Sequence, residues 1–276
     1  MEQTSLALIV CYFGKLPWYT PYFIHSARKN TSIDFLVITD DRSIIPFAGG
    51  NIQAVLTTLD EFSLRASECM QLPIKISFGY KLCDFKPAYG KIFADFLTPY
   101  TFWGHCDLDI ILGDIRGFIT EDLFSLYDLI SVRPDWLTGC FLLYRNVFKV
   151  NHLYEQSRDY VKVFTTDHHY CFDETNFAHE DFSEGKSYLE INTEIESMMH
   201  VVKKMEAIDG LRVFFDLFII EGLPGKLSWV NGQMIYKNKF EVLLYHLIYF
   251  KKVFIPKKIP DIIPDMFKIT PTKLIH

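Results

Sequence analysis

The apolar residues in the first part of the chain come in short runs separated by polar turns. Continuous apolar runs predict buried strands over 6–12, 34–39 and 51–56, and the segments 21–28 and 59–68 predict helices that alternate with them. Strands and helices that alternate at this spacing form βαβ units, whose strands lie parallel. The pattern therefore predicts an α/β fold with a mostly parallel central sheet flanked by helices.

Beyond residue 70 the pattern is less regular. The segment 165–186 is polar and irregular, and a loop of this length inside a compact domain is often functional. The remaining elements are expected to be a helix over 87–97, a strand that carries Asp107 and Asp109, strands over 129–133 and 140–144, and a helix from the N-cap Asn146 to about residue 157.

The length of 276 residues suits one large core, or one main domain with a smaller appendage. We expect a single domain over 1–252, divided into a half over 1–146 that carries the βαβ units and a smaller half over 147–252. Four prolines follow Val253, so the segment 253–276 is expected to form an extended C-terminal tail.

Composition narrows the class of protein. Hydrophobic residues make up 49% of the chain, as in folded globular proteins, and the formal net charge of -6 disfavours a nucleic-acid binder, which needs a basic surface. No apolar run approaches the roughly 20 residues that span a bilayer and no basic segment precedes the first one, so we expect a cytoplasmic protein. The six cysteines contain no C-x-x-C pair, which favours reduced thiols over disulfides.

The most informative motif is Asp107-Leu108-Asp109, which has large apolar residues on both sides. Residues i and i+2 of an extended chain point the same way, so the two carboxylates are expected to project together. Adjacent carboxylates repel each other and are costly to desolvate, and Mg²⁺ or Mn²⁺, which prefers oxygen ligands, relieves both effects. Because about one such pair is expected by chance, its surroundings must decide.

Three further residues lie where they could bind a ligand or a metal ion. In an open α/β sheet ligands bind beyond the carboxyl ends of the strands, where Asp40 can bind a base or ribose or merely cap a turn. Lys86 lies between Phe85 and Pro87 and offers a cation to a bound diphosphate. His246, in an apolar segment, is either a hydrogen-bonded core residue or a ligand that completes a metal site.

A separate zinc site is a weaker hypothesis. The polar loop holds His168, His169, His179 and Glu180, but their spacing fits no standard zinc pattern. A mobile loop that binds an acceptor substrate explains these residues better.

Taken together, these motifs resemble one family. Asp40, the segment 81–90 and the segment 104–109 look like a GT-A glycosyltransferase with its Asp-x-Asp motif, most similar to bacterial polysaccharide and lipopolysaccharide glycosyltransferases. The resemblance is best from residue 6 to about 146. It implies a GT-A, Rossmann-like sheet, a nucleotide-sugar half over 1–146 and an acceptor half over 147–252, with Mn²⁺ or Mg²⁺ as cofactor.

The resemblance also implies roles for matching residues of the N-terminal half. Asp107 and Asp109 would bind the metal ion, which holds the diphosphate of the donor, and Cys11, Tyr12 and Asp40 would line the nucleoside pocket. The metal and nearby cations would stabilise the leaving nucleoside diphosphate.

Further roles are implied for a basic residue near the donor and for later motifs. Lys86 lies where such enzymes often carry a basic residue near the donor. Asp173 or Glu174 would act as the catalytic base or bind an acceptor hydroxyl. His246 would complete the metal site and Lys251 would contact phosphate.

The favoured function is therefore a hexosyltransferase that moves a sugar from a nucleotide sugar, most simply a UDP-sugar, to a bacterial surface glycan or glycolipid. Lysines at 251, 252, 257 and 258 either contact the inner membrane, where a lipid-linked acceptor resides, or are simply solvated. One alternative is a metal-dependent phosphohydrolase or nucleotidyltransferase, although no Gly-rich phosphate loop or nucleophilic Asp follows the first strand. The other is a non-catalytic nucleotide-sugar-binding protein.

Overall fold

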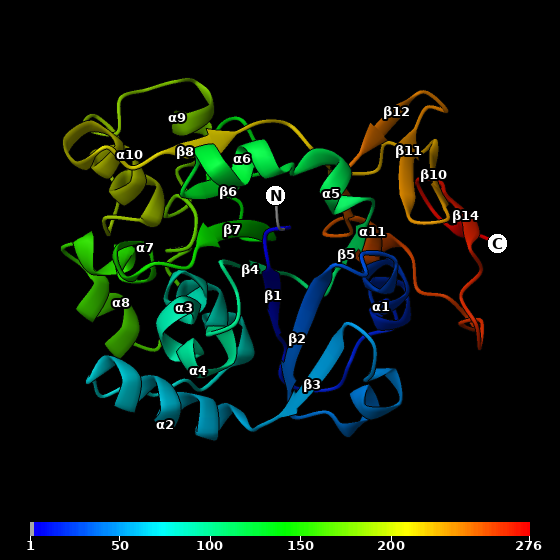
Figure 1. The fold of residues 1–276 in the computed structure, drawn as a ribbon, viewed down its shortest axis with the longest axis horizontal. Coiled ribbons are helices and arrows are strands. Elements are labelled where there is room, and N and C mark those ends of the chain that lie inside the picture. The colour runs from blue at the N-terminus through cyan, green and yellow to red at the C-terminus, as the bar shows by residue number, and fades with distance from the viewer. Residues whose placement is uncertain (1–2) are drawn as a thin grey trace.

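A seven-stranded sheet forms the centre of the computed structural model, which describes residues 3–276 (Figure 1). Its strands lie in the order β3-β2-β1-β4-β7-β6-β8. They are β1 (Leu6–Cys11), β2 (Ile33–Thr39), β3 (Ile52–Leu56), β4 (Phe102–Cys106), β6 (Leu129–Ser131), β7 (Phe141–Arg145) and β8 (Val213–Phe215). All neighbours pair in parallel except β7, which runs antiparallel to β4 and β6. The expected α/β class with a mostly parallel sheet flanked by helices is confirmed.

The two longest α-helices of the N-terminal half, α1 (Thr20–Lys29) and α2 (Leu59–Met70), lie where the sequence predicts helices. A capping box formed by Thr58 and Glu61 begins α2. The other helices are the 3₁₀ helices η1 (Arg42–Phe47), η2 (Gly79–Ala88) and η3 (Leu153–Gln156), and the α-helices α3 (Tyr89–Ile92), α4 (Ala94–Leu97), α5 (Ile115–Phe118), α6 (Glu121–Leu126), α7 (Phe148–Asn151), α8 (Tyr160–Thr165), α9 (His179–Ser183), α10 (Met198–Asp209) and α11 (Phe250–Val253).

The predictions for two helices differ from the structure in detail. The segment 87–97 divides into α3 and α4 at Phe93, whose backbone (φ −112°, ψ 26°) leaves the helical region. The helix expected over 146–157 is instead the short pieces α7 and η3. Asn146 does not cap it, because its side-chain amide donates hydrogen bonds to the carbonyls of Leu97 and Tyr100 and so fastens the end of β7 to the turn before β4.

The strand expected to carry both aspartates is also shorter than predicted. The strand β4 ends at Cys106, and Asp107, Leu108 and Asp109 form a turn before β5 (Ile110–Leu112). The chain leaves the central sheet here because β5 pairs with a different strand, β13 (Leu244–His246). Both aspartates therefore lie between two sheets rather than along one strand.

Each face of the central sheet carries its own hydrophobic cluster, and consecutive residues of β1 point into different ones. Leu6 and Leu8 belong to the cluster under α1, whereas Ala7 and Ile9 belong to the cluster under α2, α3 and α10. Figure 1 shows α1 on one side of β1 and β2 and α3 and α4 on the other. A strand buried on both faces must be apolar throughout, which explains the continuous run that predicted it.

Two smaller sheets complete the molecule. A three-stranded sheet, β5-β13-β9, adds β9 (Ile219–Ile220) parallel to β13. An antiparallel five-stranded sheet, in the order β12-β11-β10-β14-β15, consists of β10 (Leu227–Val230), β11 (Gln233–Tyr236), β12 (Phe240–Val242), β14 (Met266–Ile269) and β15 (Leu274–Ile275). The sequence pattern predicted neither sheet.

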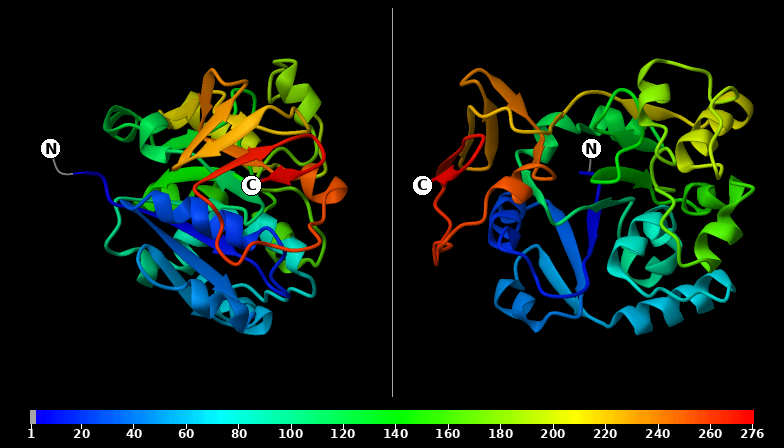
Figure 2. Two further views of the ribbon diagram at one scale, coloured as in Figure 1. Left: turned by 90° about the vertical axis from the view of Figure 1, so that its right-hand side faces the viewer. Right: turned by 180° about the vertical axis from the view of Figure 1, so that it is seen from behind.

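The segment expected to form a C-terminal tail, 253–276, begins with the last residue of α11 and is packed against the domain rather than free. It contributes β14 and β15, and Figure 2 shows it running alongside α1. Asp265 pairs with His25 and Lys29 of that helix, and His276 meets the hydroxyl of Tyr22. Its alternating pattern buries Phe267 and exposes Met266, as in a strand with one covered face.

Within 3–276 no helix has the length and apolar character needed to cross a membrane. All six cysteines are free thiols, in agreement with the expectation of reduced cysteines.

Candidate metal and substrate site

Acidic and basic side chains meet where several strands end. Asp107 follows β4, and Asp109, which is 6% exposed, precedes β5. One carboxylate oxygen of each aspartate and a ring nitrogen of His246 all lie within 4.8 Å of one another. The structure thus brings together the three residues expected to bind a metal ion.

Strand pairing brings His246 to this point from far along the chain. In the antiparallel pair of β13 and β5, His246 lies opposite Ile110, and the amide of Leu247 donates a 2.8 Å hydrogen bond to the carbonyl of Asp109. The backbone therefore holds the imidazole beside the Asp109 carboxylate, with Nε2 3.5 Å from Oδ2.

Each aspartate of the pair has a lysine partner. Lys86, from η2, places Nζ 2.6 Å from Oδ1 of Asp107 and 2.7 Å from the carbonyl oxygen of Gly139. Lys251, from α11, places Nζ 2.5 Å from Oδ2 of Asp109. Two neighbouring carboxylates at a largely buried point need such compensation, because an unpaired buried charge is expensive.

The pKa shifts reflect this network. Burial alone would raise the pKa of Asp109, but hydrogen bonds and charges from His246 and Lys251 outweigh it and hold that pKa below its ordinary value. Burial alone would lower the pKa of His246, but Cys140, Asp109 and Glu221 outweigh it and raise that pKa well above its usual range. His246 thus lies between two carboxylates, those of Asp109 and Glu221.

The donor set fits a divalent cation. Nδ1 of His246 lies 2.8 Å from Oε1 of Glu221, which is itself held by Arg133 at 2.6 Å. A carboxylate on one ring nitrogen is the usual support for a histidine that ligates a metal through the other, and here the other nitrogen faces Asp109. Two carboxylates and an imidazole suit Mn²⁺ or Mg²⁺.

The second acidic pair lies close by. Asp173 is 3% exposed, and its Oδ2 lies 3.7 Å from Nζ of Lys86, which links it to Asp107. Oε1 of Glu174 accepts a 2.6 Å hydrogen bond from the amide of Gly139, and its Oε2 lies 2.8 Å from Nε2 of His179. Lys86 and Gly139 thus connect the two acidic pairs.

The two members of this pair have opposite pKa shifts. Burial raises the pKa of Asp173 well above the ordinary value, and the charge of Lys86 only partly offsets this. Burial acts in the same direction on Glu174, but hydrogen bonds from His179 and the Gly139 amide outweigh it and lower the pKa of Glu174. Such a split is typical of a pair in which one group exchanges a proton and the other stays charged.

A fully buried ion pair holds the loop that carries Asp173. Nζ of Lys81 lies 2.9 Å from Oδ2 of Asp84 and donates to the carbonyls of Val163 and His168. The Asp84 carboxylate accepts the amides of Tyr170 and Phe172. Lys81 therefore supports the polar loop, whereas Lys86 on the same 3₁₀ helix reaches the acidic site.

The residues expected to line a nucleoside pocket lie at the ends of β1 and β2, at the same edge of the sheet. Oδ1 of the exposed Asp40 accepts a 2.7 Å hydrogen bond from the Gly14 amide, so it braces the loop after β1. Tyr12 is half-buried, and its pKa is raised by burial, with opposing effects of Lys251 and Asp109. Burial also raises the pKa of Cys11 to about 12, so its thiol stays neutral.

The polar loop does not assemble the four residues of the hypothetical zinc site. His168 and Glu180 are exposed, and His169 lies 3.3 Å from the Asp84 carboxylate. Only His179 joins a group of ligating side chains in the described part of the chain, and its companions there are Cys171 and Glu174.

Several residues of the site were missed by sequence reasoning. Glu221 follows β9, Arg133 follows β6, and Tyr19 precedes α1 and has Nζ of Lys251 5.9 Å from its ring centre. None lies in a motif or at a recognisable spacing from Asp107. Only the pairing of β9 with β13, and of β13 with β5, indicates that Glu221 belongs here.

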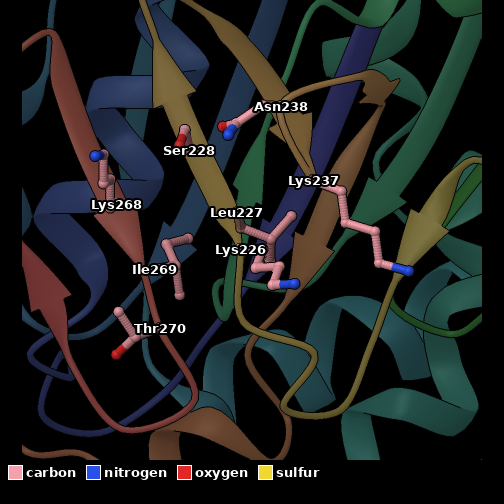
Figure 3. A pocket seen from close by; sticks show the side chains of 8 residues that line it. All are labelled: Lys226, Leu227, Ser228, Lys237, Asn238, Lys268, Ile269 and Thr270. Carbon is pink, nitrogen blue, oxygen red and sulfur yellow. The ribbon is translucent and has the colours of Figure 1, made fainter.

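A hollow of about 480 Å³ lies elsewhere, on the five-stranded sheet (Figure 3). Its lining includes the lysines at 226, 237 and 268. Figure 3 shows that their amino groups do not converge on one point. Nothing in this hollow matches the concentration of opposite charges around Asp107 and Asp109.

The fold and the site define an α/β protein with a cluster of acidic and basic side chains at the carboxyl edge of a mostly parallel sheet. Over residues 8–276 the chain belongs to a family described as a family of unknown function (DUF6625). No curated protein matches the sequence.

Proposed function

We propose that this protein is a metal-dependent glycosyltransferase that transfers a sugar from a nucleotide sugar, most simply a UDP-sugar, to a glycan or glycolipid acceptor. The observation that carries the proposal is the meeting of Asp107, Asp109 and His246 with Lys86 and Lys251 at one strand edge. Carboxylates and an imidazole hold a divalent cation, and lysines beside them suit the diphosphate of such a donor.

We also propose that the central sheet has the GT-A arrangement. Ligands of open α/β sheets bind beyond the carboxyl ends of the strands, and β1, β2 and β4 run parallel, so all three end at the edge of the sheet where Asp107 follows β4. Cys11 and Tyr12 then lie on the nucleoside side and Asp107 and Asp109 on the diphosphate side.

The chain's own residues have separate tasks in this reaction. Asp107, Asp109 and His246 would hold Mn²⁺ or Mg²⁺, which supplies positive charge to the departing nucleoside diphosphate. Lys86 and Lys251 add fixed cationic groups at that point.

The second acidic pair serves the acceptor. The raised pKa of Asp173 suits a group that takes a proton from an acceptor hydroxyl, since a base works best when its pKa lies near the working pH. Glu174, held by His179 and Gly139, keeps its negative charge and its position.

Thermal denaturation with nucleoside diphosphates tests the donor site. We expect UDP with Mn²⁺ to raise the melting temperature more than either alone, because a ligand that binds only the folded state stabilises it. Asp109→Ala should abolish this joint stabilisation and reduce sugar transfer at least 100-fold. Asp122→Ala, an exposed aspartate of α6, is the matched control and should behave like the wild type.

Two outcomes would contradict the proposal. One is the absence of any response to a panel of nucleoside diphosphates at millimolar concentration with Mn²⁺. The other is unchanged transfer by the Asp109→Ala protein. Release of phosphate from a nucleotide without sugar transfer would instead support a phosphohydrolase.

A further inference from the structure

Three side chains of different chemical type meet on the polar loop that the Lys81–Asp84 pair holds in place. Sγ of Cys171 lies 3.5 Å from Oε2 of Glu174 and 4.0 Å from Nε2 of His179, and those last two atoms are 2.8 Å apart. A thiol, a carboxylate and an imidazole thus face one another at a single point. Neither donor binding nor metal binding at Asp107 and Asp109 uses the thiol or the imidazole.

The spacing of these atoms is close to that around a tetrahedral zinc ion. Zinc lies about 2.3 Å from sulfur and about 2.0–2.2 Å from nitrogen and oxygen, so its ligand atoms are roughly 3.4–3.6 Å apart. The separation of Cys171 and Glu174 (3.5 Å) lies inside that range, whereas the separation of Cys171 and His179 (4.0 Å) is longer and that of Glu174 and His179 (2.8 Å) is shorter by about half an ångström. The backbone thus already places the three side chains close enough to bind one ion.

Neighbouring groups hold two of the three ligands in place. The amide of Gly139 fixes Oε1 of Glu174, which leaves Oε2 for the thiol and the imidazole. The ring of Trp136 packs edge-on against His179, with ring centres 5.0 Å apart. Supports of this kind orient the ligands of protein metal sites.

A cation can reach this point from solvent. The side chains of His179 and Glu174 are 32% and 24% exposed, whereas Cys171 is buried behind them. Three protein ligands on the inner side and solvent on the outer side leave a fourth coordination position open to water or substrate.

In this structure the thiol of Cys171 donates a hydrogen bond to Oε2 of Glu174, so the sulfur carries a proton when no cation is bound. A divalent cation would bind the sulfur as thiolate and release that proton to solvent, and the imidazole would bind through Nε2 in its neutral form.

We infer that Cys171, Glu174 and His179 form a second cation site, which takes a borderline-soft ion such as Zn²⁺. A thiolate and an imidazole select zinc over magnesium, whereas the carboxylate-rich site at Asp107 and Asp109 favours harder ions, so the two sites sort cations by ligand type. Gly139 separates them, since its carbonyl accepts from Lys86 and its amide donates to Glu174.

Cobalt(II) titration of the reduced, metal-free protein tests the site by a signal that does not depend on activity. Co²⁺ substitutes for Zn²⁺ and gives an intense sulfur-to-metal charge-transfer band only when a thiolate is bound. We expect the wild type to develop this band with one equivalent of Co²⁺ and to lose it when Zn²⁺ is added. Cys171→Ser should abolish the band, and His179→Ala should weaken Co²⁺ binding at least 10-fold.

Cys140→Ser is the matched control because Cys140 lies with Glu221 and His246 in the other thiol-containing cluster of the described chain. The Cys140→Ser and Asp109→Ala proteins should both keep the band. Loss of the band in Cys140→Ser, its persistence in Cys171→Ser, or no band in a folded wild type would each overturn the inference. Because Asp109→Ala affects the nucleotide response and not the band, the two proposals can fail separately.

Discussion

Lys81 and Lys86 lie five positions apart on one 3₁₀ helix and have different tasks. Lys81 is fully buried with Asp84 and donates to two carbonyls of the segment that leads to Asp173. Its charge therefore stabilises the loop and does not face the site. Lys86 lies between Asp107 and Asp173 at the edge of the site. The type of residue is the same, and the surroundings decide whether it supports the loop or serves the site.

Lys81→Met should therefore destabilise the protein by about 3–5 kcal/mol, because it leaves the Asp84 carboxylate buried without its ion pair. Lys91→Met removes the partly exposed pair with Glu155 and should cost less than about 1 kcal/mol. Urea denaturation of both variants measures the difference. Equal effects would mean that the buried pair is not what holds the loop.

The strand β4 ends directly before Asp107 and is packed tightly between its two neighbouring strands. It lies between β1 and β7, and Gly104 at its centre faces both neighbours. A β-carbon added there would lie 2.6 Å from the carbonyl oxygen of Leu142 and 2.9 Å from a methyl carbon of Leu8. Only glycine allows the three strands to come this close.

Gly104→Ala should destabilise the protein by about 1–3 kcal/mol, as overpacking of a close-packed interior does. Gly79→Ala is a suitable control, since the nearest atom to an added β-carbon there is 3.8 Å away and its backbone is not left-handed. Thermal unfolding of the two proteins compares them directly. A Gly104→Ala protein as stable as Gly79→Ala would show that β4 can shift without cost.

The C-terminal five-stranded sheet is tied to the strand beside the site. Nε1 of Trp229, in β10, donates a 2.8 Å hydrogen bond to the carbonyl of Leu112 at the end of β5, and Phe267 stacks on its ring at 5.3 Å. The C-terminal strands therefore pack against β5, the strand that directly follows Asp109. The C-terminal sheet thus helps to position a site whose sequence motif occupies only three residues.

Phe267→Ala should cost about 3–5 kcal/mol in stability, because it removes a large side chain that is 3% exposed. Met266→Ala, one position earlier in β14 and 62% exposed, should change the free energy of unfolding by less than about 0.5 kcal/mol. Denaturant titration distinguishes them. Similar losses in both variants would contradict the packing of this segment against Trp229.

Local patterns in the sequence were enough to predict the three strands and two α-helices of residues 6–70, though not the 3₁₀ helix η1, and to single out the pair Asp107 and Asp109. A strand covered on both faces must be continuously apolar, and that requirement is visible in any single run. The same reasoning failed over 146–157, where hydrogen bonds from Asn146 to distant carbonyls replace the expected cap.

The composition of the site was decided only by tertiary structure. His246 lies beside Asp109 because β13 pairs with β5, and Glu221 supports His246 because β9 pairs with β13. Pairing between strands that are not neighbours in the chain leaves no mark at either segment, since each needs only to be apolar and extended. Thus a motif of three residues marks the site in the sequence, and long-range backbone hydrogen bonds decide which other side chains join it.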